Sequence, residues 1–157
     1  MGGKSYIFKI LLIALLVVPL IFIGLVVYKN YFFTFNNLKG GFYKGPLISP
    51  TKEYTANAYY KVYGGAAGGV IIWVNVTYNN DENNVQTIYY SEAKSNFSME
   101  WIDKNTLFIQ NEEPGYPNSN RSVRLEIGKE IYHETGLACK SWLMKKKFEK
   151  CLSAIKQ

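Results

Sequence analysis

The single histidine and the two cysteines of the chain are the side chains best suited to metal binding or nucleophilic chemistry. Glu130, His133 and Glu134 stand at positions i, i+3 and i+4, a spacing that places ligands on one face of a helix, and Cys139 follows nearby. One histidine without a second ligand cluster makes a poor metal site. We therefore favour a solvated helical turn ending at Gly136, and we expect no metal ion and no cofactor.

Catalytic groups are equally sparse. His133 with Cys139 or Cys151 is the available Cys/His pairing, but both cysteines have the commoner roles of disulfide partner or buried apolar residue. The adjacent carboxylates at 81–82 and 112–113 lie in polar loops, where no apolar surroundings raise a carboxyl pKa for acid catalysis. We predict no catalytic residues, and an enzyme is the less favoured interpretation.

Residues 64–69 are rich in glycine, as are loops that bind phosphate. No Lys-Ser or Lys-Thr pair follows, and strand-like runs flank the segment on both sides. The segment is therefore interpreted as the turn of a β-hairpin.

Cys139 and Cys151 could form a disulfide, but two lines of reasoning conflict. Apolar residues recur at helical spacing from Met144 to Ile155, and a continuous helix from about Ser141 would hold the two cysteines roughly 15 Å apart, beyond the ~7 Å between Cα atoms that a disulfide allows. An even number of cysteines outside the cytoplasm favours the bridge. Both alternatives stay open, with a slight preference for the disulfide.

Two surfaces suggest binding. Some of the 13 tyrosines must point away from the core of any alternating sheet, and an exposed row of rings could bind a glycan or a partner, although packing on both faces of the sheet is the commoner arrangement. The tyrosines of this possible aromatic platform are Tyr59, Tyr60, Tyr63, Tyr89 and Tyr90.

Basic residues near the C-terminus carry most of the net charge of +6. They could contact anionic head groups or envelope polymers, or they could simply solvate the outer face of a helix. These lysines are Lys145, Lys146, Lys147 and Lys150.

Residues 10–28 form an uncharged, strongly apolar run that reaches about 28 Å as a helix, close to the ~30 Å of a bilayer core. A cleaved signal peptide is disfavoured because the run is long and its end, Val26, Val27 and Tyr28 before Lys29, offers no small residues for a cleavage site. The myristoylation pattern fails at Tyr6. We predict one uncleaved membrane-spanning helix.

The orientation is less constrained, because Lys4 and Lys9 before the span are balanced by lysines after it. A long C-terminal domain translocates largely regardless of its own charge. We therefore expect a cytoplasmic tail at 1–9, a transmembrane helix at 10–28, an irregular connector at 29–50 and an extracytoplasmic domain at 51–157.

The domain is expected to be α+β. Alternating apolar residues predict a hairpin near residues 54–63 and 70–78, and further short strands at 85–90, 97–102, 106–110 and 122–127. Polar turns at this spacing predict an antiparallel meander. A C-terminal amphipathic helix, capped by Ser141, would cover the apolar face of the sheet.

A resemblance to a known family is carried by three segments: 49–60, ending in Tyr-Tyr; 63–70, with Gly-Gly-Ala; and 99–103, with Trp-Ile-Asp. Together they resemble an uncharacterised family of small membrane-anchored proteins from bacilli, domain of unknown function family 5412. The resemblance implies a Gram-positive envelope setting. It implies no activity and no site residues.

The sequence thus predicts a single-pass binding or scaffolding module of the cell envelope. Its partners would be the lipid bilayer and anionic envelope polymers or another membrane protein, with no nucleic acid. A small envelope enzyme or an extracytoplasmic ligand sensor is the alternative.

Overall fold

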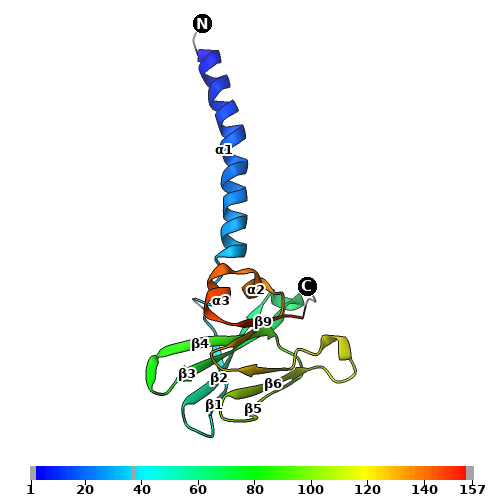
Figure 1. Cartoon of the computed structure of the whole chain (residues 1–157). Helices are drawn as coiled ribbons and strands as arrows, with labels where there is room; N and C mark the ends of the chain where they lie inside the picture. Colours follow the sequence, from blue (N-terminus) through cyan, green and yellow to red (C-terminus); the bar gives the residue numbers. More distant parts are fainter. Residues whose placement is uncertain (1–2, 37, 155–157) are drawn as a thin grey trace.

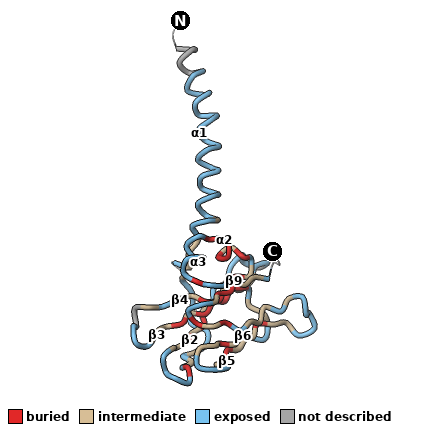
Figure 2. The backbone as a smooth tube through the Cα atoms, in the orientation of Figure 1, coloured by how far each residue is buried: buried red, intermediate tan, exposed pale blue. Residues whose placement is uncertain are grey.

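The computed structural model describes residues 3–36 and 38–154 (Figure 1). The remaining residues fall in the predicted tail, connector and C-terminal helix, and those parts of the predictions lie outside the described residues. Helix α1 (Gly3–Tyr31) stands apart from the β-rich domain that follows it. Residues 8–29 are all exposed, so this part of the helix is not buried in the hydrophobic core of the domain (Figure 2). Its segment Phe8–Tyr31 has the length and composition of a membrane span.

Two sheets make up the domain. The larger, sheet A, has the strand order β1-β2-β3-β4-β8-β9, and the smaller, sheet B, has the order β5-β6-β7. The strands of sheet A are β1 (Gly41–Ile48), β2 (Tyr54–Tyr63), β3 (Gly69–Tyr78), β4 (Asp81–Glu92), β8 (Glu130–His133) and β9 (Lys150–Leu152). Sheet B consists of β5 (Asn96–Trp101), β6 (Thr106–Glu112) and β7 (Val123–Glu126). Short helices α2 (Leu137–Lys140) and α3 (Trp142–Lys147) and the 3-10 turns η1 (Gly65–Ala67) and η2 (Pro117–Ser119) complete the fold.

The alternating pattern of the sequence builds the core between the two sheets. Ala56 and Ala58 pair with Val76 and Val74 across β2 and β3, and all four are fully buried. Period-two alternation sends these side chains to one face, where they meet Leu107 and other aliphatic residues of sheet B. The predicted α+β class and the predicted hairpin with its glycine-rich turn are confirmed.

A buried amide joins the two sheets. Asn111 of β6 is fully buried; its Nδ2 donates to the Tyr89 hydroxyl at 2.7 Å and to the Glu92 carbonyl at 2.8 Å. Its Oδ1 accepts from the backbone N–H of Lys94 at 2.8 Å. Because each polar atom is paired, the amide can be buried without the penalty of an unsatisfied group.

The predicted irregular connector is wrong for its second half, where residues 41–48 form β1. Its breaking residues are accommodated because β1 is an edge strand with register shifts at residues 42–44 and 44–47. Pro46 has no backbone N–H to donate, and an edge strand tolerates this. Gly45 has a φ of 130°, and a Cβ at this position would meet the Ala56 carbonyl oxygen. Strand β1 therefore begins well before the predicted domain boundary.

The predicted antiparallel meander accounts for only part of the topology, because β4 pairs in parallel with β8 and β8 pairs in parallel with β9. Strands this short have no periodic signal of their own. The predicted long C-terminal helix ends at Lys147, and β9 occupies part of its range. Met144 and Phe148 are both buried in the cluster around Ile131. Their helical spacing therefore comes from burial in the same cluster, although the chain is already extended at Phe148.

The domain is layered along the direction of α1. Figure 1 shows α2 and α3 between the end of α1 and sheet A, with β5 and β6 farther from α1. A second apolar cluster fills this helical layer, built from Ile131, Ala138, Met144 and Phe148 with Phe33 and Phe35 of the segment after α1. We call this layer, residues 32–36 and 38–40 with α2, α3 and β9, the anchor-side layer.

Candidate functional site

The end of α1 packs directly on α3. The ring of Trp142 lies 5.3 Å from that of Tyr31 and 5.5 Å from that of Phe32. The Ser141 hydroxyl donates to the Phe33 carbonyl oxygen at 2.7 Å and also accepts from the Met144 backbone N–H at 3.4 Å, as the predicted helix cap. One serine therefore begins α3 and holds the chain that leaves α1.

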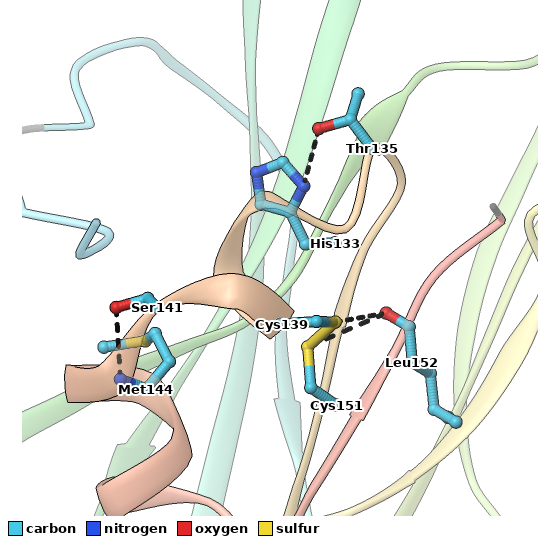
Figure 3. Close-up of a disulfide and its surroundings, with 7 residues drawn as sticks. All are labelled: His133, Thr135, Cys139, Ser141, Met144, Cys151 and Leu152. Carbon is cyan, nitrogen blue, oxygen red and sulfur yellow. Dashed lines mark hydrogen bonds between the residues drawn. A yellow bond between two sulfur atoms is a disulfide. The ribbon is translucent and has the colours of Figure 1, made fainter. Parts of the chain in front are cut away.

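His133 lies beneath this contact and is 3 % exposed. Its ring stacks on Tyr90 at 4.9 Å and packs against Phe33 and Phe35 at 5.3 and 5.9 Å. Burial lowers the pKa of the imidazole to about 4, so the ring is neutral at pH 7. Its Nδ1 lies 3.3 Å from the Thr135 hydroxyl (Figure 3).

The predicted helical turn around His133 is wrong, because residues 130–133 form β8. Glu130 binds Lys150 at 3.0 Å, whereas Glu134 binds Arg121 at 2.6 Å, so the two carboxylates serve separate ion pairs. Burial would raise the pKa of Glu134, but the Arg121 guanidinium and the hydrogen bonds from the Glu92 backbone N–H and the Ser91 hydroxyl lower this pKa overall. Among residues 3–36 and 38–154, no group of three His, Cys, Asp or Glu side chains is arranged to hold a metal ion.

Cys139 of α2 and Cys151 of β9 are joined by a disulfide, with 5.2 Å between their Cα atoms (Figure 3). The geometric conflict found in the sequence disappears because the helix stops at Lys147 and the chain turns back along β8. With both sulfurs bonded, neither cysteine is a thiolate nucleophile for His133. The bridge ties α2 to the edge of sheet A.

Three of the four selected lysines share one short helix. Lys145, Lys146 and Lys147 form the exposed last turn of α3, whereas Lys150 belongs to β9 and pairs with Glu130. Trp142 and Leu143, on the same helix, are 52 % and 41 % exposed. We call Trp142, Leu143 and these three lysines the α3 surface. It combines an exposed aromatic ring with clustered positive charge beside the end of α1.

The five selected tyrosines do not form one platform. Tyr89 is fully buried between the sheets, and Tyr60 lies over a cleft on the inner side of sheet A. Tyr59, Tyr63 and Tyr90 lie on the opposite face of the sheet, where Tyr59 stacks on Trp73 at 5.9 Å and Tyr63 donates to Glu92 at 2.6 Å. The alternation of the strands separates them because adjacent residues point to opposite faces.

Hollows lie on both faces of sheet A. On the face that carries His133, a groove of about 380 Å³ is lined by Leu38, Lys39, Lys61, Tyr63, Ile71, Trp73 and Tyr90. It shares Ile71 and Tyr90 with a hollow of about 420 Å³ that reaches Arg121 and Glu134. On the inner side, a more apolar cleft of about 750 Å³ lies between Tyr43, Tyr60, Val70 and Phe97. Sequence reasoning missed these sites because each brings together distant segments.

A family model described as "Family of unknown function (DUF5412)" matches residues 6–120. The match covers α1 from residue 6 and the strands from β1 to β6, but not β7, β8, α2, α3 or β9. No curated protein and no solved structure matches the chain.

Proposed function

The chain belongs to the family of unknown function DUF5412, and from that premise we propose that it is a single-pass, membrane-anchored binding or scaffolding module of the cell envelope. In this proposal α1 is the anchor and the α3 surface is the part of the domain that meets the lipid head groups. The bilayer is the first partner, and anionic envelope polymers are the second.

The exposure of α1 supports the anchor. Its side chains are exposed all along residues 8–29, whereas the core helix of a soluble protein would bury one face. The contacts of Tyr31, Phe32 and Phe33 with Ser141 and Trp142 hold the C-terminal end of α1 against the domain.

The disulfide supports an extracytoplasmic domain. Bonds of this kind persist in oxidising compartments and are rare in the cytoplasm. In intact cells, a membrane-impermeant reductant followed by an impermeant maleimide should label Cys139 and Cys151. Labelling that requires cell lysis would contradict this orientation.

The observation that carries the proposal is the position of Lys145, Lys146 and Lys147 on α3, the helix that packs against the C-terminal end of α1. A lysine close to an anionic bilayer contributes about 1 kcal/mol of attraction at low salt. Trp142 suits the same boundary, because its ring is apolar while its N–H can reach water.

Quenching of tryptophan fluorescence by lipids brominated near the head group tests this arrangement. In vesicles of phosphatidylcholine with one third phosphatidylglycerol, we expect quenching of the full-length protein that weakens with added salt. The K145Q/K146Q/K147Q variant should lose the salt-sensitive part, and K44Q/K52Q/K104Q, which removes three exposed lysines elsewhere, should keep it. Equal quenching of both variants would overturn the contact through α3.

The same packing favours a ligand sensor as a second function. Ser141 and Trp142 couple the domain directly to the end of α1, so a change in the anchor-side layer would reach the anchor without a flexible linker. Spin labels on α1 and β6 would then report a smaller spread of distances in the wild type than in Ser141→Ala.

A further inference from the structure

The groove of about 380 Å³ beside the anchor-side layer has a lining that suits one kind of ligand, because it combines two lysines with aromatic and aliphatic side chains. Its floor comes from neighbouring strands: Trp73 of β3 stands opposite Tyr90 of β4 in the register, and Ile71 extends the floor by one position on the same face. Its wall is the chain that returns from α1, at Leu38 and Lys39. Volumes of this size are typical of small-ligand sites.

Gly40 allows the wall to lie close to the sheet. A Cβ at this position would overlap the Tyr60 carbonyl oxygen and the Trp73 ring, so only glycine lets the chain cross here. Trp73, which also stacks on Tyr59, is only 3 % exposed and forms the base of the groove. The groove is thus preformed by backbone packing.

The charge of the groove is positive where it meets solvent. Lys39 and Lys61 line it, both are exposed, and neither takes part in an ion pair with the described residues, unlike Lys94, Lys129 and Lys150. The carboxylate of Glu92, which stands opposite Ile71 in the register, already accepts hydrogen bonds from Tyr63 at 2.6 Å and from Lys94 at 3.2 Å. The two lysines are therefore available to an anion.

The groove also faces the anchor. It opens on the face of sheet A that α2, α3 and the chain after α1 cover elsewhere, as the shared cluster around Ile131 and His133 shows. In Figure 1 the turn between β2 and β3 rises toward the level of α2, near the C-terminal end of the described chain. Lys61, Tyr63 and Ile71 are next to this turn.

We propose that this groove binds the phosphorylated head group of an anionic phospholipid from the bilayer that holds α1. Lys39 and Lys61 would bind the phosphate, and Leu38, Ile71 and the edge of Trp73 would contact the glycerol and first methylene groups. This inference rests on the proposed function, since it needs the domain to lie at a bilayer, but it uses different residues from the α3 surface.

The test uses full-length protein in a neutral maltoside detergent, titrated calorimetrically with dihexanoyl phosphatidylglycerol or dihexanoyl phosphatidylcholine. We expect the anionic lipid to bind at least about tenfold more tightly, and the K39Q/K61Q variant to lose about tenfold or more of that affinity. The K39R/K61R variant should keep it, because arginine retains the charge. The matched control K52Q/K104Q removes two exposed lysines at distant turns and should bind as the wild type does.

The proposal would be overturned by equal affinity for the two lipids or by wild-type affinity in K39Q/K61Q. Displacement of the anionic lipid by an equal concentration of inorganic phosphate would also overturn it, because that would assign the groove to a soluble anion. Loss of affinity in K145Q/K146Q/K147Q alone would also transfer the lipid site to α3. Failure of the proposed function is separable, because it is measured by quenching in vesicles with the α3 variant.

Discussion

The core between the sheets and the anchor-side layer bury apolar side chains in different ways. Between the sheets, Ile72, Val74, Leu107 and Leu125 are aliphatic, almost wholly buried and supplied by strands in antiparallel pairs. The anchor-side layer mixes aromatic and aliphatic side chains and joins distant segments, with Phe33 and Ser141 separated by 108 residues. Its small cluster is supplemented by a disulfide, a buried imidazole and a shared hydroxyl.

This difference indicates separate roles. Each sheet contains hairpins that form from contacts close in sequence, and the aliphatic core that joins the two sheets makes the domain stable. A layer that depends on a few specific cross-links makes the position of the domain relative to α1 conditional on those links. The layer is therefore where changes of pH, redox state or sequence should uncouple α1 from the domain while the two-sheet core remains folded.

The largest effect is expected in the core. Leu107→Ala removes a fully buried side chain and should lower the free energy of unfolding by about 2–5 kcal/mol, measured by urea titration of the full-length protein in detergent. Ile102→Ala, at a half-exposed position, is the control and should change it by less than about 0.5 kcal/mol. Similar losses of unfolding free energy in both variants would contradict the assignment of the main stability to the buried core between the sheets.

Acid should weaken the anchor-side layer through His133. The pKa is about 4 in the folded chain and about 6.5 when unfolded, so between these values the unfolded chain binds more protons and stability falls as the pH falls. The loss from pH 7 to pH 4 should be roughly 3 kcal/mol. Because the chain has one histidine, His133→Gln should flatten this slope between pH 6.5 and 5. An unchanged slope in the variant would assign the effect to carboxylates.

Reduction of the disulfide should cost somewhat less. The bridge spans 12 residues, and opening it with a reductant at neutral pH should remove about 2–3 kcal/mol. Hydrogen exchange should speed up in α2, α3 and residues 33–35 but not in β2 and β3. Faster exchange throughout sheet A would show that the layer and the core unfold together.

Loss of the serine cross-link should be the smallest effect. Ser141→Ala removes both the helix cap and the bond to the Phe33 carbonyl, so we expect about 1–2 kcal/mol of destabilisation. Ser119→Ala, which removes an exposed hydroxyl bond in a loop, is a matched control with little effect. Calorimetry of the two variants side by side would measure the difference.

Periodicity accounts for what could be predicted. The strands from 54 to 78 and the apolar run of α1 follow from residue spacing alone, and Ser141 was recognisable as a cap because serine at that position can accept from a backbone N–H. The same rule misled at 144–155, where Met144 and Phe148 are buried by one cluster without a continuous helix. Residues 130–133 misled similarly, because four residues cannot distinguish a strand from a helical turn.

The sequence by itself determined that an apolar helix precedes an antiparallel, tyrosine-rich domain, because hydrophobic periodicity is a local property of the chain. Only the tertiary structure decided that Cys139 meets Cys151 and that Lys39 and Lys61 line one groove. These relations depend on register, on where α3 ends and on the path of the chain across Trp73. Such long-range packing leaves no periodic signal in the residues that make it.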